Sequence, residues 1–219
     1  MIAMGIPAHN IFATNKLHAV VGTSFALHKF NQKGLVDFKR FFPKAFILVF
    51  IFGAIGSLTI VRVPAEYLYK MIPILMFLIL LYKICFFNHG VEDTNKHLIN
   101  PTLVILIFAP LMGFYDGFFG PGAGMFWMFI LIVFLGQNML KSSANTKLLN
   151  VASNIGSLIV FIPTGLILYK VGIVMSFGQI IGSWLGVHLS VKKGAKFINT
   201  MFICVMTALV IKMFWKYYF

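Results

Sequence analysis

The stretch that decides the fold is Gly113–Gly124, which reads GFYDGFFGPGAG and lies between two long apolar runs. It holds five glycines, one proline and a single acidic residue, Asp116. A carboxylate at mid-bilayer depth costs about 2.5–3.5 kcal/mol on insertion scales, and irregular backbone at that depth is tolerated only inside protein or beside a watery cavity. The sequence therefore predicts a helix broken at residues 120–122, with a functional site beside the break.

Composition places this stretch in a membrane protein. The chain has 219 residues, 60% of them hydrophobic, and a mean hydropathy of +0.93. Several apolar windows reach the roughly 18–20 residues that are needed to cross a hydrocarbon core of ~30 Å. The expected fold is all-α, a polytopic membrane protein of about 7 helical segments.

The charge pattern indicates the orientation of the chain. The net charge of +13 comes from 18 Lys and Arg residues against five acidic ones. The basic residues lie mostly between the apolar runs and form no patch on a soluble domain, so they indicate cytoplasmic loops rather than a nucleic-acid partner. If the loops at 29–44, 83–100, 137–147 and 190–197 are assigned to the cytoplasmic side, twelve of the eighteen basic residues lie on that side.

Proline and glycine positions divide the chain into helices. Pro43 opens one span, Pro73 predicts a kink in another, and glycines 53 and 56 predict close helix packing, as do the glycines at every fourth position over 178–186. We expect helical segments at 8–28, 43–61, 67–87, 101–119, 123–135, 140–162, 172–189 and 197–214, the fourth and fifth being halves of the broken helix.

The two halves of the chain resemble each other at an offset of about 130 residues. Ala13–Leu17 (ATNKL) falls on Ala144–Leu148 (ANTKL). The loop at 29–44 is basic, whereas its partner at 163–171 holds only Lys170, and a reversed charge bias indicates inverted-topology repeats. The predicted organisation is a first repeat at 1–88, a polar connecting loop at 89–100 and a second repeat at 101–219.

The first repeat is expected to lack its glycine-rich hairpin. In the first repeat, the counterpart of Gly113–Gly124 would lie one repeat offset earlier in the chain, which places it before Met1. We therefore expect about 30 residues to be absent, through an upstream start site, a truncated gene or genuine reduction.

Four stretches together resemble the sulfite exporter TauE/SafE family, also called the TSUP family. They are GFYDGFFGPGAG, ATNKL at Ala13, KGLVDFKR at Lys33, and AN-x-K-LLN-x-ASNIGSL from Ala144 to Leu158. The resemblance covers essentially the whole chain, apart from the absent first-repeat segment. It implies a multi-pass permease of the cell (inner) membrane that moves small anions such as sulfite, sulfonates or related organosulfur compounds.

The break itself is the first candidate substrate site. Free backbone N–H groups at the start of the second half-helix, together with the helix dipole, would attract an anion; the alternative is that the glycines only permit tight packing. Asp116 is interpreted as a proton-coupling group, with a helix cap or a structural pair with a lysine as alternatives. The substrate-binding candidates here are Tyr115, Asp116, Gly117, Gly120, Pro121, Gly122 and Gly124.

Two lysines at equivalent repeat positions, Lys16 and Lys147, are the second candidate. They either line the anion path or extend to the membrane interface. The amides assigned to the same path are Asn15, Asn145, Asn150 and Asn154, and the last two share a helical face.

No catalytic motif, nucleotide-binding loop or cofactor motif is recognisable, so we expect no cofactor and no enzyme. The polar cluster of His89, Glu92, Asp93 and His97 lacks metal-ligand spacing and is interpreted as loop polarity. The expected partners are the lipid bilayer and a small anionic substrate, with a homo-oligomer left open. Two alternatives to a permease are an inactive or structural remnant of one, prompted by the absent hairpin, and a membrane-embedded enzyme.

Overall fold

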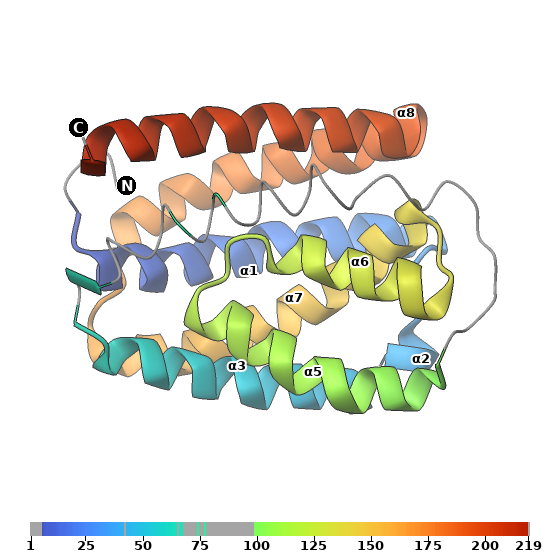
Figure 1. Cartoon of the computed structure of the whole chain (residues 1–219), viewed down its shortest axis with the longest axis horizontal. Helices are drawn as coiled ribbons and strands as arrows, with labels where there is room; N and C mark the ends of the chain where they lie inside the picture. Colours follow the sequence, from blue (N-terminus) through green and yellow to red (C-terminus); the bar gives the residue numbers. More distant parts are fainter. Residues whose placement is uncertain are drawn as a thin grey trace.

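A computed structural model describes residues 6–41, 43–64, 66–67, 74, 77 and 99–218 of the chain. Every regular element within these residues is a helix (Figure 1). The elements are α1 (Ala8–Gln32), α2 (Phe38–Phe41), α3 (Lys44–Arg62), α5 (Pro101–Phe118), α6 (Ala123–Leu135), α7 (Met139–Phe161), the 3-10 helix η2 (Ile162–Thr164) and α8 (Tyr169–Tyr218). The predicted all-α fold is confirmed, and the bounds of α3, α5, α6 and α7 match the expected ones closely.

Two features differ from the expected helices. The short α2 forms within the basic loop, where no helix was predicted. The loop expected before the last span is reduced to Gly194, whose φ of 70° and ψ of −167° interrupt α8 and turn the chain back. The predicted span at 67–87 with its Pro73 kink, and almost all of the polar loop at 89–100, lie outside the described residues.

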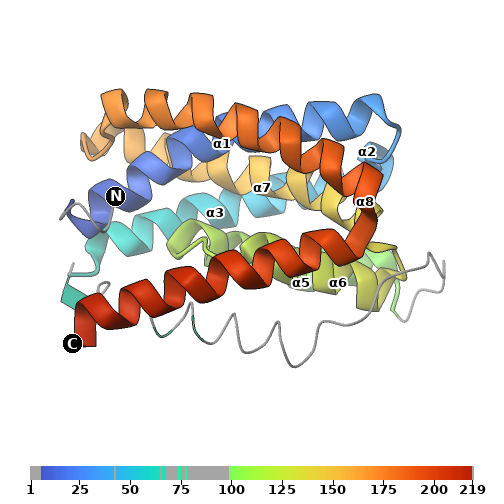
Figure 2. The ribbon, with the colours of Figure 1, turned by 90° about the horizontal axis from the view of Figure 1, so that it is seen from above.

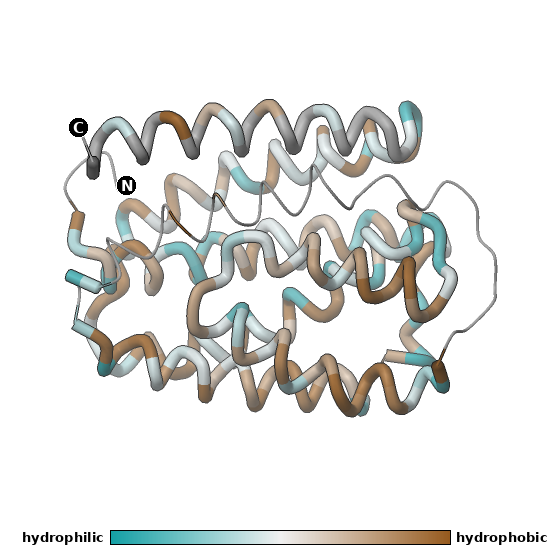
Figure 3. The backbone as a smooth tube through the Cα atoms, in the orientation of Figure 1, coloured by the Kyte–Doolittle hydropathy of each residue, from teal (hydrophilic) through white to brown (hydrophobic). Residues whose placement is uncertain are grey.

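The long helices run roughly along one common direction, as expected for a bundle across a bilayer (Figures 1 and 2). Within the described residues, four helices are long and apolar enough to cross a membrane: Lys44–Arg62, Pro101–Phe118, Met139–Thr164 and Tyr169–Gly194. Apolar residues dominate α3, α5 and α6, whereas polar residues gather at the turns (Figure 3). The 13 residues of α6 are too few for a full crossing, since they extend only about 20 Å.

Helix α7 forms the centre of the bundle. It contacts α1, α3, α5, α6 and α8, and 56% of its apolar window is buried, compared with 11% for α8. The α7 sequence is polar at its start and rich in Ser, Ala and Asn. Such small side chains permit close approach of neighbouring helices in a membrane, where van der Waals packing and interhelical hydrogen bonds drive association.

Glycines in α3 and α5 bring these two helices into backbone contact. A Cβ atom built on Gly117 would overlap the backbone of Gly53, and one built on Gly56 would overlap the backbone of α5. On the other side of α3, Gly156 of α7 lies equally close to the Phe50 carbonyl. The close packing predicted for Gly53 and Gly56 is therefore confirmed, and α3, α5 and α7 form a compact unit.

The glycines of α8 do the opposite of what their spacing predicts. No described atom lies within 4 Å of a Cβ built on Gly178, Gly182 or Gly186. The expectation of a close packing face is thus wrong for the described part of the chain, and Gly182 and Gly186 instead border open space.

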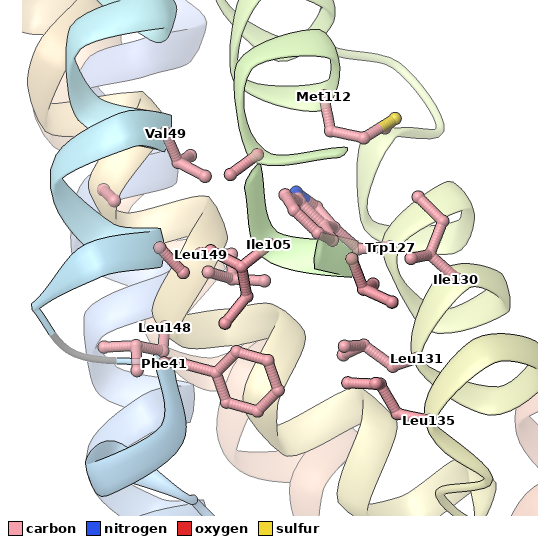
Figure 4. Close-up of a cluster of buried hydrophobic side chains, with 14 of the residues drawn as sticks. Phe41, Val49, Ile105, Met112, Trp127, Ile130, Leu131, Leu135, Leu148 and Leu149 are labelled. Atoms are coloured by element: carbon pink, nitrogen blue, oxygen red, sulfur yellow. The ribbon is translucent and has the colours of Figure 1, made fainter. Parts of the chain in front are cut away.

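An apolar cluster holds α6 against the compact unit of α3, α5 and α7. Trp127 is 2% exposed and lies between Met112, Ile105 and the α6 residues that follow it (Figure 4). Leu148 and Leu149 contribute from α7. This cluster fixes the orientation of α6 and hence the position of its first turn.

Replacement of Gly117 by alanine should destabilise the protein by about 2–3 kcal/mol or more, because the added methyl group forces α3 and α5 apart. Equilibrium unfolding in detergent micelles measures this change. Gly178→Ala is the matched control and should be neutral. Equal stability of the two variants would contradict the packing of α3 on α5.

Candidate functional site

The predicted break is a reversal of the chain between α5 and α6. Gly120 and Gly122 adopt φ angles of 86° and 80°, a left-handed conformation that glycine reaches without strain. The Tyr115 hydroxyl donates to the Pro121 carbonyl at 2.6 Å across the turn. The two helices thus form a hairpin, which is the arrangement predicted for residues 120–122.

The tip of this hairpin lies inside the bundle. Asp116, in the last turn of α5, contacts Lys16 and Ser153, which lie well inside α1 and α7. Helix α3 runs beside α5 but continues beyond the level at which α5 ends (Figure 1). The irregular backbone is therefore surrounded by protein, as membrane depth requires.

A buried ion pair anchors the tip. The Lys16 Nζ lies 2.9 Å from Asp116 Oδ1, and the two side chains are only 2% and 7% exposed. The ammonium also donates to the Asp116 backbone carbonyl, and the Ser153 hydroxyl donates to Asp116 Oδ2. Among the alternatives for Asp116, the structure thus forms the pair with a lysine, and the pair joins α1, α5 and α7.

Lys16 also compensates the end of α5. The final carbonyls of a helix have no intrahelical partner and carry negative partial charge. The ammonium of Lys16 satisfies one of them, and it lies 3.4 Å from the position of a Cβ built on Gly120. The positive φ of Gly120 favours glycine at this turn, and a Cβ would also lie 3.3 Å from the Asp116 carbonyl and carboxylate oxygens.

A cavity of about 420 Å³ lies on the other side of the hairpin, between α6, α7, α1 and α8. Lys147 lines it, and no ion-pair or hydrogen-bond partner for this lysine exists among the described residues. Polar side chains surround the lysine in a largely apolar wall. The lining polar residues are Ser143, Thr146, Gln179, Ser183 and Ser190, and the hairpin contributes Gly122 and Gly124.

One lining hydroxyl has no partner of its own. Thr146 is 1% exposed, and its Oγ1 accepts and donates no hydrogen bond within the described chain. The same holds for Oδ1 of Asn150, whose Nδ2 lies beside Gly124. Buried polar atoms are almost always paired in native proteins, so these two atoms are unsatisfied polar groups next to the cavity wall.

The structure divides the predicted site residues into four groups. Lys16, Tyr115, Asp116, Gly120 and Pro121 form the anchored tip, while Lys147, Gly122 and Gly124 border the cavity together with nearby Asn150. Gly117 packs against α3. The remaining amides lie elsewhere: Asn145 bonds Gln137 and the Asp37 N–H, Asn154 is buried in α7, and Asn15 is half-buried on α1.

Sequence reasoning missed two contributions. Ser153 completes the carboxylate cluster, and its signal was its place one helical turn after Asn150 on α7. Gln179 and Ser183 line the cavity from α8 and bond His18 and the Gly22 carbonyl of α1. Their spacing of four residues, between the glycines, marks one face of α8.

A model of the family described as "Sulfite exporter TauE/SafE" matches residues 1–213 of the chain. The chain belongs to this family. A probable membrane transporter protein of Sinorhizobium sp., ORF9, is 37% identical over 214 residues, which cover 97% of this chain and 81% of that protein. The probable membrane transporter protein YfcA of Escherichia coli K12 is 36% identical, with 94% and 76% of the two chains covered. A probable membrane transporter protein of Haemophilus influenzae is 35% identical, with 97% and 83% covered.

Membership of the TauE/SafE family makes this a membrane transporter protein rather than an enzyme, as predicted. No solved structure is significantly similar to the chain. The long apolar helices agree with this class. Within the described part of the chain, no group of three or more His, Cys, Asp or Glu side chains is placed to hold a metal ion; the polar cluster at residues 89–97 lies outside that part.

Removal of one member of the ion pair should destabilise this TauE/SafE protein strongly. We expect Lys16→Met or Asp116→Leu to lower the free energy of unfolding by about 3–5 kcal/mol, because either change leaves a buried charge unpaired. The free energy of unfolding should decrease less in the double variant than in either single variant. A double-mutant cycle in detergent measures the coupling, and strictly additive losses would contradict the pair.

Proposed function

We propose that this protein is a secondary transporter of small anions, and that its substrate binds in the cavity beside Lys147. The observation that carries the proposal is a lysine without an anionic partner in the described chain, in a cavity formed where the broken-helix hairpin meets α1, α7 and α8. Discontinuous helices between packed bundles are where secondary transporters hold their substrates.

The surroundings of Lys147 suit an anion with several acceptor oxygens. The ammonium provides charge-assisted hydrogen bonds, which are about twice as strong as neutral ones. Ser143 contributes a hydroxyl group to the same space, and the unpaired Thr146 hydroxyl lies beside it. Helix α6 begins at Ala123, directly after Gly122, without a side-chain cap, so the positive end of its dipole also faces the cavity.

The neighbouring carboxylate does not oppose this proposal. Asp116 would repel an anion if it were free, but Lys16 neutralises it and Ser153 donates to it. The net charge that remains next to the hairpin is the one on Lys147. The pair also gives a physical basis for the coupling role proposed for Asp116, since protonation of the carboxylate would weaken the anchor of the hairpin.

The family description, a sulfite exporter, supports the proposed substrate class. Sulfite, sulfonates and related organosulfur anions are the proposed cargo, and alternating access around the hairpin, driven by an ion gradient or the membrane potential, is the proposed mechanism. Met125, Met128 and Met139 line the cavity beside the polar groups. A polarisable thioether wall would suit a sulfur-containing anion with an apolar portion.

The proposed setting is the inner membrane, with several passes and two inverted repeats at 1–88 and 101–219. Helices α1 and α7 pack against each other and run in opposite directions (Figure 1), as equivalent helices of inverted repeats would. The turns around residues 33–43 and 136–138 and the kink of α8 lie at one end of the bundle (Figure 1). Lys33, Lys39 and Arg40 lie in the first of these turns, and Lys192 and Lys193 lie beside the kink, which favours a cytoplasmic location for that end.

Lys147→Gln should reduce uptake or efflux of radiolabelled sulfite and sulfonates in proteoliposomes by about tenfold to a hundredfold, which corresponds to the loss of one charge-assisted hydrogen bond. Lys170→Gln removes the same charge from an exposed position outside the cavity and serves as the control. If the full-length protein transports no small anion, the proposal fails. Normal transport by Lys147→Gln would reject only the assignment of the cavity.

Gly182→Leu tests the cavity by volume instead of charge. The new side chain meets open space, so the fold should persist while most of the transport is lost. Gly178→Leu, one turn earlier and not part of the cavity lining, should transport normally. Substrate-induced thermal stabilisation, measured in the same two variants, separates lost binding from lost movement. Equal transport by both variants would exclude this cavity as the route.

A further inference from the structure

A second pocket lies between α1 and α8, and no residue of the hairpin lines it. It has a volume of about 280 Å³ and lies between the last turns of α1 and the middle of α8. Its lining residues are Lys29, Gln32, Lys33, Trp184, Val187 and His188. The proposed transport cavity shares Val187 with this pocket, but it does not include the two lysines, the tryptophan or the histidine. The charged part of this pocket is therefore distinct from the cavity.

The pocket concentrates positive charge without an acidic partner. Neither Lys29 nor Lys33 forms an ion pair within the described part of the chain. Lys29 is held by the Phe25 ring, 5.7 Å from its centroid, and by the Gln32 amide oxygen at 3.3 Å. The His188 ring stacks on Trp184, with centroids 6.1 Å apart. Two ammonium groups and an imidazole thus surround one small, open space.

An exposed apolar stripe leads away from this pocket along α8. Val174, Phe177, Ile181 and Trp184 follow at helical spacing, and they are 71%, 66%, 60% and 52% exposed. Ten residues of helix extend about 15 Å, which equals one leaflet of a ~30 Å hydrocarbon core. The stripe therefore has the length and character of a surface for one acyl chain.

The pocket is lined by the last turn of α1, which leads directly into the basic loop at residues 33–44. Tryptophan is enriched at the level of lipid headgroups, and basic pockets at the cytoplasmic side of membrane helices bind anionic headgroups. A phosphate next to Lys29 and Lys33 would have its chain directed along the stripe. A soluble phosphate would use the lysines but not the stripe.

We propose that this pocket binds the phosphate headgroup of an anionic phospholipid, with one acyl chain along the outer face of α8. The lipid would fix the C-terminal part of α1 against α8 by a contact that neither helix makes alone. The inference needs only a membrane location, and it is independent of the transported substrate.

Trp184 provides a native reporter for the test. The full chain carrying Trp215→Phe retains Trp184 and the buried Trp127, and it is reconstituted into phosphatidylcholine vesicles. Two preparations are then compared. One receives a minor fraction of brominated phosphatidylglycerol and the other the same fraction of brominated phosphatidylcholine, and both lipids carry the bromine near the headgroup end of the acyl chains. We expect the exchange constant for quenching to favour phosphatidylglycerol by about tenfold, since each lysine near a membrane contributes a severalfold preference.

Matched variants separate a site from the general surface potential. Lys29→Gln/Lys33→Gln should abolish the preference, and Lys29→Arg/Lys33→Arg should keep it. Lys39→Gln/Lys44→Gln removes the same charge at the same end but outside the pocket, and should keep it too. Equal quenching by the two lipids, or equal loss in both glutamine pairs, would overturn the proposal. The proposal would also be overturned if the preference for phosphatidylglycerol disappeared in inorganic phosphate but not in chloride of equal ionic strength. That result would assign the pocket to a soluble anion.

Discussion

The rest of the structure depends on the contact between Lys16 and Asp116. An isolated charge of either sign is unfavourable at this depth, whereas the pair with its hydrogen bond from Ser153 is neutral and satisfied. The same ammonium bonds a terminal carbonyl of α5, so one side chain compensates both the carboxylate and the end of the helix. This double role permits the chain to reverse at Gly120 inside the bundle, and it sets where α6 begins.

The pair also creates an asymmetry between two lysines that occupy equivalent places in the predicted repeats. Lys16 is committed to Asp116, whereas Lys147 borders a cavity without a counter-charge in the described chain. The hairpin separates them, because its last turn of α5 faces Lys16 and its first turn of α6 faces the cavity. A neutral, rigid anchor and an available positive charge thus lie on opposite sides of one short loop.

The helices and the break were predictable from sequence, because apolar length, proline and the glycine cluster at 113–124 are local signals. The partner of Asp116 was not, since Lys16 is 100 residues away and the sequence offers eighteen basic residues. The spacing of the glycines in α3 and in α8 predicted close helix packing at both places. Only the packing distinguishes Gly53, which touches α5, from Gly182, which borders the cavity. Gln179 and Ser183 could not be predicted as cavity-lining residues, because this role depends on where α8 lies relative to α1.

These two uses of glycine constrain how access to the cavity can alternate. Helices α3, α5 and α7 meet backbone to backbone at Gly53, Gly117 and Gly156, and interfaces packed so closely resist small displacements. Helix α8 faces the cavity across open space and meets α1 through hydrogen bonds such as that from Ser183 to the Gly22 carbonyl. A movement that opens the cavity therefore requires less repacking if α8 and α1 shift against the compact unit than if α3 does. Because Lys16 lies on α1 and Asp116 on α5, such a shift would act directly on the buried pair, which links the anchor of the hairpin to the proposed transport step.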